Sequence, residues 1–415
     1  MSIADFSGRV RPDACPGALQ VHEAADGRLA RVRLPGGAVT PVQLREIAAC
    51  ADELGSGVIE LTSRANVQVR GLRSDSAAAF AERIAAVGLL PSAAHERVRN
   101  IIGSPLGGRG PGGLLDTQPM VDALDRALCA RPRPAGLPGR FLFVLDDGTG
   151  DVAGLGGDVT FAAVSSGYGR LLLAGSDSGL VVSLDSAVPL MISAAEAFLD
   201  ERSSLSESAG TAWRIHELEN GPERIAERLN DFTVQQADPG ALNEEIDHAA
   251  SAGAGDVGGA GGLGGAGGGR RAGRVGQRDG RVALEALVPL GRLTPGQARA
   301  LADGGPEVRL TPWRSTVLLD LSPAGADRAA NVLEEAGLVV DPASPWAGVT
   351  ACTGRPGCAK SLADVQADAR RWVKSLDAAP RTPVHWAGCE RRCGLPRGQV
   401  VQMIATEDGY QERQQ

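Results

Sequence analysis

The sequence predicts an α+β protein of pseudo-twofold symmetry, and two observations lead to this prediction. The first is an internal duplication: residues 34–44 (LPGGAVTPVQL) and 288–298 (VPLGRLTPGQA) share Pro, Gly, Thr, Pro and Gln at one constant offset. The second is the Gly/Ala-rich tract 249–280, which has almost nothing to bury and is typical of a disordered linker. Two related strand–helix–strand units imply a site where the two halves meet.

Each copy of the duplication contains the start of a helix. Thr40 and Thr294 suit the N-cap position, because proline follows at the first helical position and glutamine three residues after the threonine completes a capping box. Behind Thr40, apolar residues recur at helical spacing at Leu44, Ile47, Ala48 and Ala51. We therefore expect a helix after each threonine.

A strand is expected after each helix. Residues 58–70 (VIELTSRANVQVR) alternate with period two, which predicts one continuous strand with an apolar and a polar face. The polar face would present Glu60, Thr62, Arg64, Asn66, Gln68 and Arg70. Residues 308–318 resemble this strand with one extra residue near Pro312, where we expect a bulge. The two arginines of the first strand suit bidentate recognition of carboxylates, and a solvated sheet face is the alternative.

The rest of the chain predicts mixed α/β structure on both sides of the linker. Strand-like runs at 141–147 (FLFVLDD) and 171–176 (LLLAGS) are followed by helix-like stretches at 192–202 and 221–231. We expect two half-domains at 10–80 and 281–340, two α/β domains at 90–245 and 345–415, and the linker at 249–280.

Composition and charge exclude several classes of function. The net charge of −8, with no basic stripe, argues against a nucleic-acid-binding protein. No run of about 18 apolar residues predicts a transmembrane helix, so we expect no membrane partner. The first residues, MSIADFSGRVRPDACPG, lack the apolar core of a signal peptide. We therefore expect a cytoplasmic protein.

Four of the seven cysteines fall in the last 64 residues as two pairs, Cys352-x5-Cys358 and Cys389-x3-Cys393. Four thiolates can hold a 4Fe–4S cluster or a tetrahedral zinc ion. Zinc sites favour tight C-x2-C pairs, which neither pair matches, and the glycines around both pairs would let backbone N–H groups approach a bulky cluster. Structural zinc and four incidental cysteines are the alternatives, whereas Cys15, Cys50 and Cys129 are expected to be ordinary thiols.

These motifs resemble the nitrite/sulfite reductase superfamily. The resemblance rests on the two cysteine pairs, on Thr62-x-Arg64-x-x-x-Gln68 and on the duplication, and it spans nearly the whole chain except the linker. It implies duplicated ferredoxin-like half-domains, two mixed α/β reductase-type domains, a 4Fe–4S cluster on Cys352, Cys358, Cys389 and Cys393, and an iron tetrapyrrole bound between the halves. Within the superfamily the sequence is most similar to the precorrin-3B synthases, through residues 14–17 (ACPG), 62–71 (TSRANVQVRG), 310–314 (LTPWR) and 384–389 (VHWAGC).

The resemblance also assigns expected roles to individual residues. Arg64 occupies the position that contacts macrocycle carboxylates and the anionic substrate in the reductases, and Arg99 occupies the arginine of a second element. A Lys-Phe-Lys element of the reductases corresponds to Arg140-Phe141-Leu142, so the second cation is lost. This loss disfavours the reduction of sulfite or nitrite, because delivering protons to a small oxyanion needs those cations. Cys393 occupies the position that bridges cluster and siroheme iron.

The implied function is oxidation of precorrin-3A by dioxygen to the hydroxy-lactone precorrin-3B, a monooxygenase reaction of aerobic cobalamin biosynthesis. The family is associated with a 4Fe–4S cluster, a mononuclear non-haem iron and NADH as reductant, which could act through a separate electron-donor protein. A siroheme-dependent sulfite or nitrite reductase is the alternative, and a non-catalytic iron–sulfur or zinc module is a third interpretation.

The polycarboxylate substrate calls for cationic and amide side chains in its pocket. The candidates are Arg64, Asn66, Gln68, Arg70, Arg99, Arg140 and Arg314. The sequence identifies no catalytic residue and no ligand of a mononuclear iron. Of the five histidines, His385 lies four residues before Cys389 and is the one to test as a ligand, although a core position is its ordinary interpretation.

Overall fold

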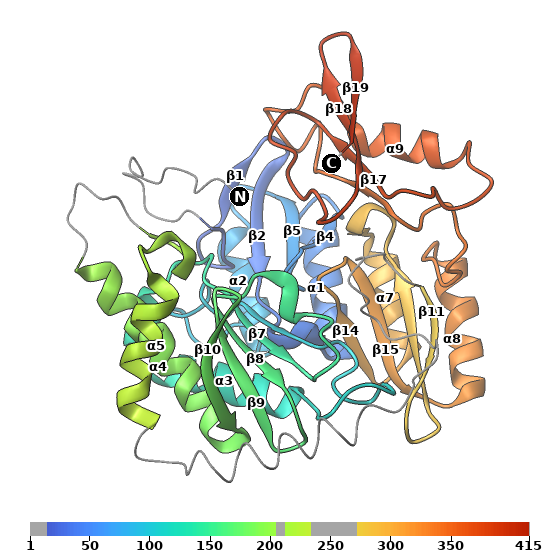
Figure 1. The fold of residues 1–415 in the computed structure, drawn as a ribbon. Helices are drawn as coiled ribbons and strands as arrows, with labels where there is room; N and C mark the ends of the chain where they lie inside the picture. The colour runs from blue at the N-terminus through green and yellow to red at the C-terminus, as the bar shows by residue number, and fades with distance from the viewer. Residues whose placement is uncertain (1–14, 205–211, 234–271, 415) are drawn as a thin grey trace. The chain divides into compact units, whose positions relative to one another are not determined.

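The computed structural model describes residues 15–204, 212–233 and 272–414 and contains two compact units (Figure 1). The first unit comprises the described residues within 92–264. The second unit combines residues 16–91 with the described residues from 272 onwards. Both copies of the duplication and all four paired cysteines belong to the second unit, so that unit positions the candidate site.

Two five-stranded sheets form the centre of the second unit. One contains, in spatial order, β1 (His22–Ala24), β2 (Gly27–Val32), β5 (Val67–Leu72), β4 (Ile59–Leu61) and β13 (Arg292–Leu293). The other contains β11 (Gly273–Gly276), β12 (Val282–Leu287), β15 (Ser315–Leu321), β14 (Glu307–Leu310) and β3 (Ala38–Val39). Each sheet therefore ends in a two-residue strand contributed by the other half, since β13 pairs with β4 and β3 pairs with β14.

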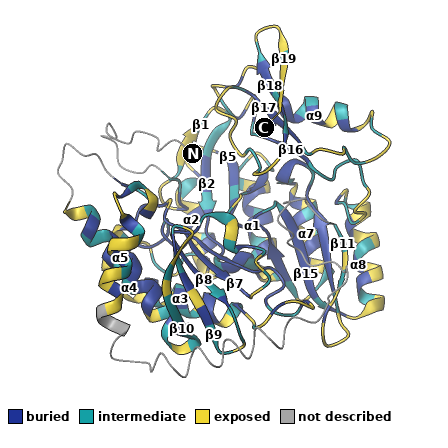
Figure 2. Cartoon of the chain, in the orientation of Figure 1, coloured by how far each residue is buried: buried dark blue, intermediate teal, exposed yellow. Residues whose placement is uncertain are grey.

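The helices of the two halves also match. They are α1 (Pro41–Leu54), α2 (Ala77–Ala86), α7 (Pro295–Gly304) and α8 (Pro323–Glu335). Both predicted capping boxes are confirmed: the Gln43 N–H donates to Thr40 Oγ1 and the Gln297 N–H to Thr294 Oγ1, each at 3.2 Å. In return, each glutamine side chain accepts from the backbone N–H of its threonine. A single apolar core runs through both halves (Figure 2).

The predicted continuous strand at 58–70 is wrong, because the segment is a hairpin of β4 and β5. Leu61 lies opposite Val67, and between them Thr62 Oγ1 accepts from the Arg64 and Asn66 N–H groups. The alternation survives the turn because Leu61 and Val67 are six positions apart, and residues an even number of positions apart have the same parity in a pattern of period two. A single strand and a hairpin therefore share one pattern.

The second copy repeats this hairpin residue for residue. Leu310 lies opposite Thr316, and Thr311 Oγ1 accepts from the Trp313 and Ser315 N–H groups. The expected bulge is therefore wrong, since Pro312 lies in the turn and no extra residue is present. The turn residues with positive φ correspond as well, at +55° for Ala65 and +62° for Arg314. Arg314 in the second hairpin thus takes the position of Ala65 in the first and places a guanidinium group there.

The C-terminal part of the second unit is a four-stranded sheet. Its strands, in order, are β16 (Val349–Ala351), β17 (Val384–Ala387), β18 (Val401–Thr406) and β19 (Gly409–Gln414). Strands β16 and β17 are parallel, as are β17 and β18, and α9 (Val365–Val373) packs against β16 and β17. Trp372, Trp386 and Tyr410 pack together in its core, with ring centroids 4.8–5.9 Å apart.

The first unit is a separate α/β structure with one mixed sheet. In spatial order it contains β10 (Ser176–Ser183), β9 (Tyr168–Leu173), β8 (Val159–Ala163), β7 (Phe143–Asp146) and β6 (Ile101–Gly103). Its helices are α3 (Gln118–Ala130), α4 (Leu184–Ser203) and α5 (Gly221–Thr233). The helix expected at 192–202 begins eight residues earlier, because the Ser183 hydroxyl caps its first turn.

Of the predicted linker 249–280, residues 249–271 lie outside the described residues. Its end is not a linker, because Gly273–Gly276 forms strand β11 against β12. Gln277 anchors the turn that follows, donating from Nε2 to Asp320 Oδ1 at 2.8 Å and accepting from the Asp320 N–H at 3.0 Å. Within the described ranges, no helix combines the length and apolar character needed to cross a membrane.

Candidate metal centre and adjacent cationic pocket

The four paired cysteines meet at one end of the C-terminal sheet. Cys352 follows β16 directly, and Cys389 comes two residues after β17, so the parallel pairing of these strands brings both chain segments to the same sheet edge. Cys358 and Cys393 lie on the loops that continue from them. All four cysteines line one cavity of about 400 Å³, which we call the cysteine cavity.

The four thiols do not form the compact group that a single zinc ion needs. Tetrahedral zinc with Zn–S bonds of about 2.3 Å needs sulfur atoms roughly 3.8 Å apart. In the described part of the chain, no three of these Sγ atoms lie within 4.8 Å of one another, because the only such group of His, Cys, Asp or Glu ligands is elsewhere. A cluster of four irons is several ångströms wide and needs its thiolates further apart.

Glycines allow neighbouring side chains to pack closely against both cysteine loops. A Cβ at Gly357 would lie 2.7 Å from Arg70 Nη2, and one at Gly354, where φ is +69°, would lie 2.8 Å from Val365 Cγ2. An added Cβ at Gly388 would overlap the Ser361 hydroxyl. The Gly388 N–H donates to Cys352 Sγ at 3.1 Å, the kind of bond that protein N–H groups make to cluster sulfurs.

The thiols influence one another electrostatically. Burial raises the pKa of Cys352, the N–H groups of Gly388 and Gly354 oppose this rise, and Cys393 and Cys358 add to it. Partial burial and then Cys389 and Cys358 raise the pKa of Cys393. Metal ligation requires thiolates, so the positive charge of bound iron has to offset this cost of ionisation.

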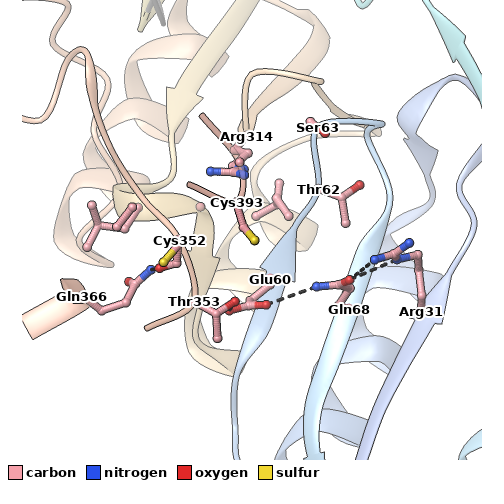
Figure 3. Close-up of a pocket in the computed structure, with 15 residues that line it drawn as sticks. Arg31, Glu60, Thr62, Ser63, Gln68, Arg314, Cys352, Thr353, Gln366 and Cys393 are labelled. Carbon is pink, nitrogen blue, oxygen red and sulfur yellow. Dashed lines mark hydrogen bonds between the residues drawn. The ribbon is translucent and has the colours of Figure 1, made fainter. Parts of the chain in front are cut away.

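A second cavity adjoins the first. It has a volume of about 270 Å³. Figure 3 shows residues that line it, among them Cys352 and Cys393. These two cysteines also line the cysteine cavity. The wall of the second cavity carries two guanidinium groups, on Arg31 of β2 and Arg314 of the β14–β15 turn, with the polar side chains Thr62, Ser63, Gln68, Thr353 and Gln366. We call it the arginine cavity. Burial lowers the pKa of Arg314, while the charges of Glu60 and Cys352 raise it, and the guanidinium stays charged.

Glu60 is the most connected side chain of this wall. Arg292 donates to Glu60 Oε1 from Nε and Nη2, at 2.9 and 2.7 Å. Arg70 and Gln68 donate to Glu60 Oε2, each at 3.1 Å. The Glu60 side chain is only 10 % exposed, so its charge depends on these partners. Arg292 comes from the exchanged strand β13, and both halves of the duplication thus contribute to one ion network.

The predicted site residues of the second unit fall in different places. Gln68 and Arg314 line the arginine cavity. Arg70 lines the cysteine cavity, but its guanidinium already binds Asp26 at 2.7 and 2.9 Å, Glu60 and the Gly357 carbonyl. Asn66 is buried, and its Oδ1 accepts from the Leu34 N–H at 2.8 Å. Arg64 lies in the β4–β5 turn and belongs to the lining of neither described cavity.

Arg99 and Arg140 belong to the first unit. Arg99 is buried and binds Asp125 with two bonds of 2.6 Å. Arg140 is exposed, and its guanidinium lies 4.9 Å from the centre of the Trp213 ring. Leu142, the residue in place of a second cation, is 3 % exposed. In the second unit, His385 is fully buried in β17 and pairs through Nδ1 with Thr350 Oγ1 at 2.6 Å, which is a core position.

Sequence reasoning missed Arg31 and Arg292 as site residues and placed Glu60 on the polar face without a role. Arg31 gives a weak signal, because it is one of two arginines in β2 (GRLARV) and lies next to the buried Ala30 and Val32. Arg292 gives no such signal, since its site role arises only from the strand exchange that pairs it with Glu60.

A group of three carboxylates occurs in the first unit. Asp146, Asp147 and Asp151 have ligand oxygens within 4.8 Å of one another. Asp146 accepts from four backbone N–H groups, at Gly148, Gly150, Val152 and Ala153. These bonds stabilise the negative charge of Asp146 and order the loop that follows it.

Comparisons with known proteins agree with this geometry. The nitrite/sulfite reductase ferredoxin-like half domain matches residues 21–87 and 275–336, which hold the two copies of the duplication. A precorrin-3B synthase from Sinorhizobium sp. is 27 % identical over 97 % of this chain and 82 % of its own. The assimilatory ferredoxin-dependent nitrite reductase of Haloferax mediterranei is 25 % identical over 88 % of this chain and 68 % of its own.

Among solved structures, the Mycobacterium tuberculosis NirA protein superimposes with a TM-score of 0.71 at 21 % identity. The match covers 93 % of this chain and 73 % of NirA. The predicted fold class of duplicated ferredoxin-like half-domains with mixed α/β domains is confirmed by this likeness and by the half-domain match.

Proposed function

Because the chain contains both ferredoxin-like half-domains of the nitrite/sulfite reductases and resembles a precorrin-3B synthase over almost its whole length, we propose that it oxidises precorrin-3A with dioxygen to precorrin-3B. Its named relatives are oxidoreductases, and redox chemistry on or with a tetrapyrrole is the shared theme. The observation that supports a site for this chemistry is the sharing of Cys352 and Cys393 between the cysteine cavity and the arginine cavity.

The cysteine cavity fits a 4Fe–4S cluster. Cys352, Cys358, Cys389 and Cys393 would hold it, since all four line this cavity of about 400 Å³. When bound, the cluster supplies one electron at a time, which is what the activation of dioxygen requires. The reductant, NADH or an electron-donor protein, and the mononuclear iron expected of precorrin-3B synthases belong to this proposal and have no assigned residues.

The arginine cavity fits the carboxylate-bearing edge of a tetrapyrrole. Arg31 and Arg314 would bind carboxylates, and Gln68 holds Arg31 in place through bonds to its side-chain oxygen. A guanidinium can bind a carboxylate with two parallel bonds, which fixes the orientation of the macrocycle. Arg70 takes a different role from the one expected, since its bonds to Asp26, Glu60 and Gly357 make it a support of the cysteine loop.

A siroheme-dependent sulfite or nitrite reductase is the second candidate, supported by the nitrite reductases among the relatives. The buried Leu142 argues against it, because that position supplies no cation to a small anionic substrate. In a macrocycle oxidation no such cation is needed. The tetrapyrrole is therefore proposed as substrate rather than as resident cofactor.

Anaerobic purification followed by iron and acid-labile sulfide analysis tests the cluster. We expect about four of each per chain. Serine in place of any paired cysteine should abolish them, while Cys50→Ala, which changes a buried thiol of α1, should leave both contents unchanged. Zinc without sulfide would refute the cluster.

The reaction is tested by incubating the purified protein with precorrin-3A, a reductant and dioxygen, and by mass spectrometry of the product. We expect precorrin-3B with one oxygen atom from dioxygen. A siroheme absorption spectrum of the pure protein, together with reduction of sulfite or nitrite, would refute the monooxygenase proposal in favour of the reductase.

A further inference from the structure

A continuous chain of hydrogen bonds leads away from the arginine cavity. Arg31 donates to Gln68 Oε1 from Nε at 3.0 Å and also from Nη2, and Gln68 Nε2 donates to Glu60 Oε2 at 3.1 Å (Figure 3). Arg31, Gln68 and Glu60 come from the neighbouring strands β2, β5 and β4. Their backbone pairing aligns the three side chains, since Arg31 lies opposite Gln68 and Gln68 opposite Glu60.

Beyond Glu60 the hydrogen bonds continue in two branches, through Arg70 and through Arg292, and both branches reach the loop between Cys352 and Cys358. Arg70 binds Glu60 and donates from Nη2 to the Gly357 carbonyl at 2.8 Å. Arg292 binds Glu60 and donates from Nη2 to the Thr353 carbonyl at 3.0 Å. Thr353 follows Cys352 and Gly357 precedes Cys358, so the two arginines hold both ends of the loop that connects these cysteines.

Within this chain of hydrogen bonds, the side-chain amide of Gln68 can take two orientations. Its oxygen faces Arg31 and its nitrogen faces Glu60, and a rotation about its last torsion exchanges them. A ligand carboxylate that engages Arg31 competes with the Gln68 oxygen for the same N–H groups. Once Arg31 turns to the ligand, the Gln68 oxygen loses these two bonds. The amide is then held through Nε2 alone, and its rotation away from Glu60 removes a donor from that carboxylate. Arg70 and Arg292 remain as donors to Glu60, and its negative charge is less compensated than before.

We propose that the Arg31–Gln68–Glu60 chain makes the reduction potential of the cluster depend on whether a carboxylate occupies the arginine cavity. The inference rests on the proposed function, because it requires a cluster on the four cysteines. Hydrogen bonds and net charge around a cluster set its potential. With the cavity filled, the less compensated Glu60 charge makes the potential more negative, and the cluster becomes a stronger reductant. The electron is thereby withheld from dioxygen until substrate is bound.

Linkage requires that the effect be reciprocal. If occupation lowers the potential, reduction must weaken carboxylate binding by the same free energy. For a one-electron couple, a tenfold loss of affinity on reduction corresponds to about 59 mV. The two quantities can be measured independently on the same protein.

The experiment uses the full chain with its cluster and uroporphyrin I, a tetrapyrrole that carries only carboxylate side chains, as the probe. The midpoint potential is measured by redox titration followed by electron paramagnetic resonance, with and without saturating probe. The dissociation constant of the probe is measured for the oxidised and for the reduced protein. We expect a more negative potential with the probe and a matching loss of affinity on reduction.

Two variants separate the hydrogen-bond chain from the direct effect of a nearby polyanion. Gln68→Met removes both bonds of the amide at similar volume. Gln366→Met makes the same chemical change in the same cavity, at a residue whose Nε2 donates to the Cys352 carbonyl at 2.9 Å and which lies outside the chain. We expect Gln366→Met to keep the full probe-induced shift and Gln68→Met to keep only the part due to direct repulsion. Should Gln68→Met fail to fold, Arg31→Met breaks the chain at its outer end and should give the same reduced shift at saturating probe.

The outcomes are distinct. An unchanged shift in Gln68→Met or Arg31→Met, or bound probe without any shift in the unmodified protein, overturns the inference and leaves the proposed function standing. A protein without iron and sulfide overturns the proposed function and the inference with it.

Discussion

The Glu60–Arg292 pair allows a quantitative test of how the two halves are joined. Glu60 lies on β4 of the first half and Arg292 on β13 of the second, and their side chains are 10 % and 17 % exposed. Removing one partner of a buried ion pair leaves the other charge without compensation and typically costs 3–5 kcal/mol. Glu60→Gln should fall at the lower end, about 3 kcal/mol, because Arg70 keeps Asp26 and the new amide oxygen still accepts a bond.

A matched control exists on the surface of the same unit. Arg45 of α1 and Asp303 of α7 also join the two halves, at 2.5 Å, but their side chains are 48 % and 62 % exposed. Exposed pairs contribute about 0–1 kcal/mol because water and salt screen them. The two pairs thus differ in burial, and Glu60 in addition accepts from Arg70 and Gln68.

The assay is a double-mutant cycle for each pair, with free energies of unfolding from urea titrations followed by tryptophan fluorescence. Glu60→Gln and Arg292→Met should show a coupling energy of about 2 kcal/mol that persists in 0.5 M salt. Asp303→Asn and Arg45→Met should couple by less than about 0.5 kcal/mol. Equal coupling energies for the two pairs, or a Glu60→Gln protein as stable as the unmodified one, would refute this reasoning.

Three further predictions concern single positions. Gly394→Ala should reduce binding of a tetrapyrrole probe at least tenfold, because its Cβ would overlap Arg314 Nη2, whereas Gly398→Ala, at a similar φ but with open space around it, should bind normally. Burial raises the pKa of Asp151 to about 7, so the folded protein binds this proton more tightly than the unfolded chain does. The free energy of unfolding of the first unit should therefore fall by up to roughly 4 kcal/mol between pH 4 and 7, and Asp151→Asn should flatten that pH profile. Thr294→Ala should lower the free energy of unfolding of the second unit by about 1 kcal/mol and Thr294→Ser by much less, measured by urea titration.

The parts of the fold that local chemistry determines could be predicted from the sequence. The capping boxes at Thr40 and Thr294 follow from three residues each, and both helices begin there. The hairpins could not be told from single strands, because the turn between Leu61 and Val67 preserves the alternation of apolar and polar residues. What distinguishes the hairpin from a strand is that the Thr62 hydroxyl accepts from two backbone N–H groups. These bonds form only in the folded turn, so the sequence alone does not reveal them.

The candidate site shows the same division. The cysteine pairs could be recognised because the two members of each pair are close in sequence, although the pairing of β16 with β17 brings the two pairs together. The sequence shows that the arginines are charged, but it does not show which group each of them binds. Arg70 and Arg99 are held by carboxylates that lie 44 and 26 residues away in the sequence. A partner that remote is set by the tertiary fold, and only the structure reveals which guanidinium groups face a cavity.

The exchange of β3 and β13 has a consequence for how the chain reaches its native state. Until β13 is synthesised, 232 residues after Glu60, the edge of β4 has no neighbour. An uncovered strand edge is a template for pairing with another chain. The N-terminal half alone should therefore associate with itself or with a separately supplied C-terminal half, each lending the other its missing edge strand. In this respect the single chain preserves the topology of a domain-swapped dimer, in which neither partner is complete without the other.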